Sequence, residues 1–161
     1  MSGLGRRSAG PVTREDGTRL HVLDSGGTGP ALLLLHGLAG YAGEWAQVAE
    51  RLAGACRVVA FDQRAHGSST RRPADLSRTA HVGDVVAVAD ALGLERFTLV
   101  GQSMGAHTAL LAAAAHPVRV GRLVLIEGGD RLLGCATLLA VATAGTPWSA
   151  VSRRYVSLKK S

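Results

Sequence analysis

The 161-residue chain contains few cysteines, few aromatic residues and almost no lysine, and these shortages exclude several classes of protein. Two cysteines, Cys56 and Cys135, cannot build a disulfide framework, and neither belongs to a C-x-x-C pair. A reduced, cytoplasmic setting is therefore expected. Aromatic residues make up 4% of the chain and do not interleave with a basic stripe, so no nucleic-acid partner is expected. Residues 1–10 lack the apolar run of a signal peptide, which predicts no export.

Acidic residues are missing from the end of the sequence, and this accounts for most of the formal net charge of +6. Residues 1–130 contain 13 arginines and all 12 acidic residues, a net charge of +1. Residues 131–161 contain three arginines, two lysines and no acidic residue, a net charge of +5. The first segment is thus nearly balanced. With 47% hydrophobic residues overall, the chain is long enough for one domain with a buried core.

Apolar runs alternate with helical patterns along the first 130 residues. Residues 31–35 form a continuous apolar run, typical of a strand buried on both faces of a parallel sheet, and further strands are predicted in the mostly apolar runs at 57–61, 97–100 and 123–126. Helices are predicted over residues 44–52, 77–92 and 104–116. Before them, strands at 12–14 and 19–23 flank Glu15-Asp16-Gly17, which predicts a hairpin. The alternation predicts an α/β fold with a doubly wound, mostly parallel sheet.

A Gly-x-Ser-x-Gly sequence follows the third apolar run directly and opens the next helix. It runs from Gly101 to Gly105, with Ser103 at its centre. This strand–turn–helix context is that of a nucleophile elbow, in which a sharp turn exposes the serine hydroxyl and brings backbones close together. The start of the following helix offers free N–H groups to an oxyanion. Ser103 is therefore the candidate nucleophile, and the alternative is an ordinary turn with a capping serine.

Two further motifs make residues 12–127 resemble the α/β-hydrolase family. The first is His36-Gly37-Leu38, which ends the first long apolar run. The second, Asp-Gln-Arg-Ala-His-Gly-Ser-Ser at residues 62–69, looks like the family's D-x-R-G-x-G-x-S turn with Ala65 in place of a glycine. The resemblance implies a serine hydrolase that acts on a small-molecule carbonyl in an ester, lactone, thioester or amide. It also implies that Asp62 shapes its turn and is not a catalytic acid.

The resemblance assigns roles to further residues around Ser103. The backbone N–H groups of Leu38 and Met104 would form the oxyanion hole. His36, Gly37, Gly101 and Gly105 would support the motifs without taking part in the chemistry. No cofactor or metal is implied. The glycine-rich stretch 26–29 precedes a strand instead of linking a strand to a helix, so it does not indicate a dinucleotide site.

The sequence does not complete the family's Ser…Asp/Glu…His order. Glu127 and Asp130 follow the fourth apolar run and are the candidate acids, but no histidine follows His116. His107 lies four residues beyond Ser103, on a helix predicted to run away from the elbow. The fold is therefore expected to be truncated after its sixth strand, with an incomplete triad. The alternative function is a non-catalytic, hydrolase-like fragment that binds a small molecule or a partner.

Residues 131–161 are predicted to form a basic, apolar tail outside the core at residues 11–130. The favoured interpretation is a truncated or frame-shifted end, and the second is the start of a cap helix. The third is a membrane anchor over the uncharged residues 132–152, which Pro147 disfavours. A membrane partner is therefore not expected. The last strand of the core is expected to be an open edge that allows self-association.

Overall fold

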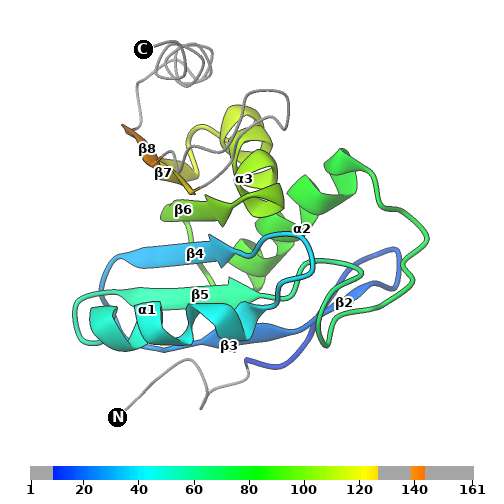
Figure 1. Ribbon diagram of the computed structural model, residues 1–161, viewed down its shortest axis with the longest axis horizontal. Helices are drawn as coiled ribbons and strands as arrows, with labels where there is room; N and C mark the ends of the chain where they lie inside the picture. The colour runs from blue at the N-terminus through cyan, green and yellow to red at the C-terminus, as the bar shows by residue number, and fades with distance from the viewer. Residues whose placement is uncertain (1–8, 127–138, 144–161) are drawn as a thin grey trace.

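The computed structural model describes residues 9–126 and 139–143 (Figure 1). Its elements in chain order are β1 (Val12–Thr13), β2 (Arg19–Leu20), β3 (Val22–Asp24), β4 (Ala31–Leu35), the 3-10 helix η2 (Ala42–Trp45), α1 (Ala46–Leu52), β5 (Arg57–Phe61), α2 (Arg78–Ala91), β6 (Phe97–Gln102), α3 (Met104–Ala115), β7 (Val120–Ile126) and β8 (Leu139–Thr143). Strands and helices alternate from β4 to β7, as the apolar runs predict.

The main sheet has the strand order β3-β5-β4-β6-β7-β8. The four inner strands are parallel, and the two outer strands run antiparallel to their neighbours. At the centre, Leu34 of β4 pairs with Ala60 of β5 and with Val100 of β6. This mostly parallel sheet confirms the predicted fold class. The carboxyl ends of its parallel strands meet at one edge, where open α/β sheets bind ligands.

Helices cover both faces of the sheet, and the core is divided accordingly (Figure 1). One cluster of buried apolar residues joins α2 and α3 to the sheet, and a second joins η2 and α1 to it. Leu33 and Leu35 belong to the first cluster and Leu34 to the second. A strand buried on both faces needs apolar side chains at every position, which is why residues 31–35 read as a continuous run.

The predicted strand at residues 19–23 is wrong in one respect, because the chain changes sheets at His21. β2 pairs with β1 in a two-stranded sheet, whereas β3 pairs with β5 in the main sheet. The His21 N–H donates to Ser69 Oγ at 2.8 Å, and the His21 carbonyl accepts from the Asp62 N–H at 2.9 Å. These loop contacts replace the ladder bonds of a continuous strand.

The expected free edge at residues 123–126 is also corrected. β8 pairs antiparallel with β7, from Leu139 opposite Ile126 to Thr143 opposite Arg122. The sheet therefore continues past the sixth predicted strand, and part of the predicted tail joins it. A strand at residues 139–143 is incompatible with a helical anchor across residues 132–152. No helix among the described residues is long and apolar enough to span a membrane.

Candidate active site

Ser103 lies at the junction between β6 and α3, in a backbone conformation that side chains rarely adopt. Its φ is 49° and its ψ is −112°, and its side chain is exposed. The Ser103 N–H donates to the Ile126 carbonyl at 2.9 Å, and the Ser103 carbonyl accepts from Ala106 and His107 at 3.0 and 3.2 Å. A positive φ costs an L-residue about 1–2 kcal/mol, so the surrounding structure must impose it. The predicted strained turn is confirmed.

The two glycines of the elbow lie where a side chain has no room. A Cβ at Gly105 would lie 2.5 Å from the Leu35 carbonyl oxygen and 2.6 Å from that of His36. A Cβ at Gly101 would collide with the backbone of Gly105 and lie 2.7 Å from Cα of Ala106. The glycines thus let α3 begin directly against the end of β4. This contact brings the loop after β4 next to Ser103.

The loop after β4 is a tight turn across residues 37–40. The Gly40 N–H donates to the Gly37 carbonyl at 3.1 Å, and Ala39 has a φ of 62°. A Cβ at Gly37 would lie 3.4 Å from Ser103 Cβ, so this turn touches the elbow. Among the described residues, neither the Leu38 N–H nor the Met104 N–H has a hydrogen-bond partner. Both are free as an oxyanion hole requires, and their convergence on one point stays a prediction.

His36 is completely buried and both of its ring nitrogens are engaged. Its Nδ1 is 2.7 Å from the Gly37 carbonyl oxygen, and its Nε2 accepts the Gln63 N–H at 3.0 Å. Burial lowers the pKa of His36, which favours the neutral imidazole. A ring held in this way cannot accept a proton from Ser103. His36 therefore shapes the loop, in agreement with the role expected from its motif.

Asp62 also has a structural role, because both carboxylate oxygens accept backbone N–H groups. Oδ1 accepts from Ala42 at 2.6 Å and Oδ2 from Ser68 at 2.7 Å. Gly67, at a φ of 51°, lies so close to this carboxylate that any Cβ would collide with it. The motif at residues 62–69 is therefore a turn built around one buried carboxylate.

Residues 30–148 match the family model of the alpha/beta hydrolase fold. The chain belongs to the α/β-hydrolase fold family. It is 40% identical over 120 residues to N-formylmaleamate deformylase of Pseudomonas putida, covering 74% of this chain and 45% of that protein. It is 42% identical over 122 residues to a 2-hydroxy-6-oxononadienedioate/2-hydroxy-6-oxononatrienedioate hydrolase of Burkholderia vietnamiensis, covering 71% of this chain and 42% of that protein.

Among solved structures, the α/β-hydrolase fold of this chain resembles that of a bacterial membrane phospholipase A. The TM-score is 0.70 at 32% sequence identity, and the match covers 78% of this chain and 41% of that one. The chain thus spans less than half the length of the relatives that it matches. The matched range continues past residue 130 and includes β8.

No histidine of this α/β-hydrolase chain contacts the hydroxyl of Ser103 through a hydrogen bond. All six histidines lie among the described residues, and none forms a hydrogen bond with Ser103 Oγ. His66 Nδ1 contacts the Arg64 carbonyl at 3.0 Å, and His81 is buried with no partner for its Nδ1. Burial lowers the pKa of His81, and burial and then Arg78 lower that of His107. The candidate acids Glu127 and Asp130 lie outside the described residues.

No motif predicted the ion pair that anchors the second loop of the site. Arg64 is 1% exposed, and its Nε and Nη2 contact the two carboxylate oxygens of Asp84 at 2.7 and 2.6 Å. Arg14 also reaches Asp84, at 3.1 Å. The sequence contained one sign of this pair: Asp84 is an acidic residue that lies next to Val85 on the inward face of α2, where a buried carboxylate needs a basic partner. The pair joins the 62–69 turn to α2 beside the hairpin.

The Ala65 substitution in the family turn leaves a backbone strain that can be relieved. Ala65 has a φ of 67°, in the left-handed region that favours glycine. Ala65→Gly should therefore raise the free energy of unfolding by up to about 1 kcal/mol, since a left-handed L-residue costs about 1–2 kcal/mol and glycine returns part of that as chain entropy. Urea unfolding measures this. Ala109→Gly, within α3, is the control that should destabilise, and an equal loss in both variants would contradict the prediction.

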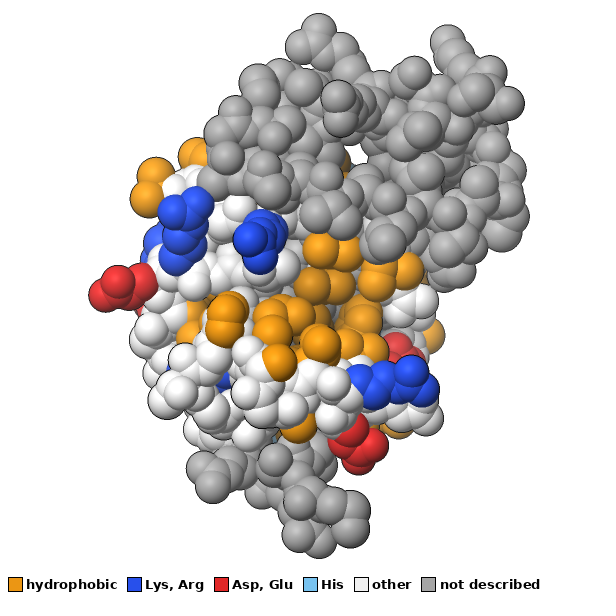
Figure 2. Space-filling model, turned by 90° about the vertical axis from the view of Figure 1, so that its left-hand side faces the viewer, with side chains coloured by type: hydrophobic (Ala, Val, Ile, Leu, Met, Phe, Trp, Pro, Cys, Tyr) orange, Lys and Arg blue, Asp and Glu red, His pale blue; other side chains and the backbone are white. Residues whose placement is uncertain are grey.

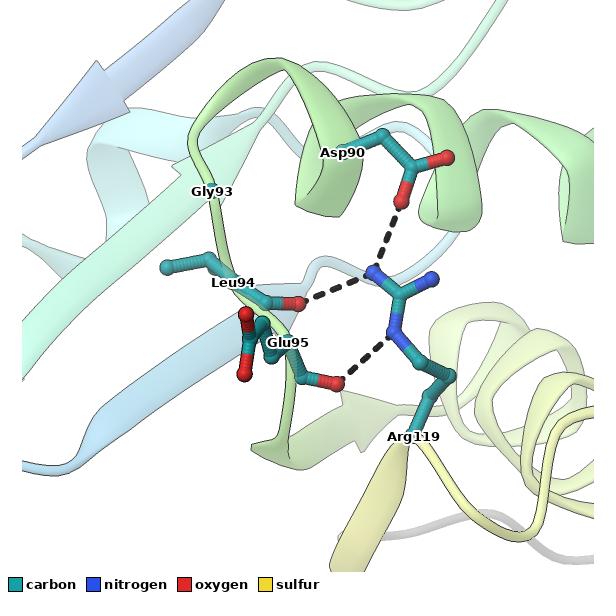
Figure 3. Close-up of a pocket in the computed structure, with 5 residues that line it drawn as sticks. All are labelled: Asp90, Gly93, Leu94, Glu95 and Arg119. Carbon is teal, nitrogen blue, oxygen red and sulfur yellow. Dashed lines mark hydrogen bonds and ion pairs between the residues drawn. The ribbon is translucent and has the colours of Figure 1, made fainter.

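The described cavities lie at the opposite edge of the sheet from Ser103. One of about 360 Å³ is lined by Asp90, Gly93, Leu94, Glu95 and Arg119 (Figure 3), and one of about 240 Å³ lies at the starts of β4, β6 and β7. In the first, Arg119 binds the Asp90 carboxylate and the carbonyls of Leu94 and Glu95 at 2.7 to 2.9 Å. Arg119 is therefore a structural clamp.

The edge of the sheet that carries these cavities holds no metal-binding group of side chains among the described residues. Figure 2 shows hydrophobic side chains gathered in the middle of this face, with acidic and basic side chains around them. Within residues 9–126 and 139–143, no group of His, Cys, Asp or Glu side chains is arranged to hold a metal ion. Ser103 lies at the other, carboxyl edge of the sheet, at the end of β6.

Proposed function

We propose that this chain carries the nucleophile and the oxyanion hole of a serine hydrolase. Ser103 Oγ attacks the carbonyl carbon of a small ester, lactone, thioester or amide, and the carbonyl π electrons move to its oxygen. The hydroxyl proton passes to solvent water or to an added base such as imidazole, and a proton from the same source goes to the leaving group. The N–H groups of Leu38 and Met104 hold that oxyanion, with the start of α3 behind them. Collapse of the intermediate expels the leaving group and leaves an acyl group on Ser103. Water then releases the acid.

The observation that carries this proposal is the conformation of Ser103. A non-glycine residue at a φ of 49°, exposed between two glycines that touch backbone, is an arrangement that stability alone does not favour. The names of the relatives support hydrolysis and differ in substrate, since they include a deformylase and a phospholipase A. The substrate class is therefore proposed only as a molecule with a reactive carbonyl, acted on in the cytoplasm.

A second function is favoured by the lack of a histidine partner for Ser103. Without a base, the serine hydroxyl keeps the weak nucleophilicity of an alcohol. Enzymes that lose triad members keep only about 10³–10⁴-fold catalysis over water. On this ground the chain would be a hydrolase-like binding fragment. It would bind a small molecule at the same edge, or a second copy along the side of β8 that pairs with no strand among the described residues.

Acetylation of Ser103 separates the two functions. The purified chain should turn over p-nitrophenyl acetate very slowly, and added imidazole should raise the rate by supplying the missing base. The increase should exceed that of Ser103→Ala, and peptide mass spectrometry should find the acetyl group on Ser103. Thr13→Ala, which removes an exposed hydroxyl on β1, is the control and should behave like the parent.

One outcome would contradict the proposal, and a second would keep it but contradict the expectation of a missing base. Equal rates for the parent and Ser103→Ala at every imidazole concentration, with no acetyl-serine, would favour the binding fragment. Rapid turnover without imidazole that vanishes in Ser103→Ala would instead show that the chain has a base of its own. Light scattering on the same samples tests association along β8.

A further inference from the structure

We propose that Gln63 is a positioning residue of the oxyanion hole. It holds His36, and His36 fixes the orientation of the peptide between Gly37 and Leu38. This inference rests on the proposed function, because it assigns the Leu38 N–H to the oxyanion. It goes beyond that function by naming a residue, distant from Ser103 in sequence, on which the direction of this N–H depends.

The peptide between Gly37 and Leu38 is fixed through its carbonyl. The Gly37 oxygen contacts His36 Nδ1 at 2.7 Å and accepts the Gly40 N–H at 3.1 Å. A trans peptide is planar, with its C=O and N–H pointing in opposite directions. Two donors on the carbonyl therefore fix the rotation of the whole unit. The Leu38 N–H is turned to the other side, where no group of the described chain accepts it.

Gln63 fixes His36 at two points. Its backbone N–H donates to His36 Nε2 at 3.0 Å, and its side-chain Nε2 donates to the His36 carbonyl at 2.7 Å. A backbone N–H can only donate, so the Nε2 of His36 must be unprotonated and its Nδ1 must carry the proton. This is the tautomer that can donate to the Gly37 carbonyl. Gln63 thus sets both the tautomer and the position of His36.

The side-chain amide of Gln63 lowers the stability of the fold, and packing alone gives no reason for an amide at this position. Gln63 is 1% exposed, and its Oε1 has no partner among the described residues. An unpaired buried carbonyl is unfavourable by about 1–3 kcal/mol, and an apolar side chain of the same length would avoid it. The amide cannot be turned to relieve this, because Oε1 would then face the His36 carbonyl oxygen. The useful part of the side chain is therefore its N–H donor to His36.

Gln63→Met tests this role, because methionine has a similar length and leaves the backbone N–H in place. The variant loses one hydrogen bond and also loses the unpaired Oε1, so its stability should change little. The imidazole-assisted acetylation of Ser103 should slow by about tenfold or more, because a misplaced oxyanion donor loses much of its effect. The loss should appear in the maximal rate and not in the ester concentration at half-saturation.

Thr108→Val is the matched control. Thr108 is equally buried, and its hydroxyl donates to the Met104 carbonyl at 3.3 Å and forms no hydrogen bond with His36. This variant should lose some stability and keep the acetylation rate of the parent. An equal slowing in both variants would overturn the proposal.

A measurement that does not need activity separates this inference from the proposed function. In ¹⁵N NMR spectra, Gln63→Met should shift the amide signals of Gly37 and Leu38 and the ring signals of His36, whereas Thr108→Val should not. If Ser103 is never acetylated, the proposed function fails and these spectra still test the positioning. Unchanged signals from residues 36–38 in Gln63→Met would overturn it.

Discussion

Asp84→Ala should lower the free energy of unfolding by about 3–5 kcal/mol, because it leaves the buried Arg64 guanidinium with only the more distant, partly exposed carboxylate of Asp16, at 3.4 Å, as a counter-charge. Arg64 and Asp84 are each 1% exposed and share two hydrogen bonds of 2.7 and 2.6 Å. Arg14 would lose its carboxylate partner as well. A loss of this size is a large part of the roughly 5–15 kcal/mol that stabilises a typical domain. Urea unfolding followed by circular dichroism measures it.

The chain offers a control in another Asp–Arg pair, which has a single contact of similar length. Asp90 contacts Arg119 at 2.7 Å, but its side chain is 58% exposed. Asp90→Ala should therefore cost less than about 1 kcal/mol. If Asp84→Ala does not fold, the milder Asp84→Asn gives the measurement. Arg64→Met with Asp84→Leu should recover part of the loss, because it removes both buried charges. A loss from Asp84→Ala no larger than that from Asp90→Ala would contradict the prediction.

The sequence predicted best those strands and helices whose bounds depend on the pattern of their own residues. The strands 31–35 and 57–61 have the expected bounds, because all of their residues except Arg57 are apolar, as burial on both faces of the sheet requires. The helix expected over 77–92 is α2 with its flanking caps, and Ser77 Oγ accepts the Ala80 N–H at 3.1 Å as an N-cap. Local chemistry was sufficient in these places.

Other bounds depend on pairing between distant strands, which no local pattern contains. β6 continues to Gln102, because the backbone of Gln102 pairs with Ile126 of β7. This pairing does not depend on the polar side chain of Gln102. β8 exists only in its ladder with β7, and its residues otherwise read as part of an uncharged stretch. The break at His21 likewise depends on the loop that carries Ser69.

The candidate site also has parts that a local motif predicts and parts that depend on contacts between distant segments. Ser103, Gly101 and Gly105 follow from one local motif, because the elbow requires small residues at fixed spacing. The clamp of Gln63 on His36 joins two loops that are 27 residues apart in sequence, and the Arg64–Asp84 pair spans 20. These contacts arise only when the parallel strands bring their carboxyl ends together.

Gly105→Ala should destabilise the chain by about 3 kcal/mol or more, at or beyond the upper end of the usual cost of overpacking. The added Cβ would lie 2.5 and 2.6 Å from the carbonyl oxygens of Leu35 and His36. Both obstacles are backbone atoms at the end of a buried strand, so no flexible side chain can yield. α3 would have to move away from β4, and Met104 would move with it.

Gly37→Ala is the control for this effect, because it adds the same methyl group on the other side of the elbow. Its Cβ would lie 3.4 Å from Ser103 Cβ and 3.6 Å from the Gln102 carbonyl oxygen, which are ordinary contacts. The expected loss is below about 1 kcal/mol. Urea unfolding of both variants compares the two sides of the junction. If Gly105→Ala lost no more stability than Gly37→Ala, the close approach of α3 to the end of β4 would not be what holds Ser103 in its strained conformation.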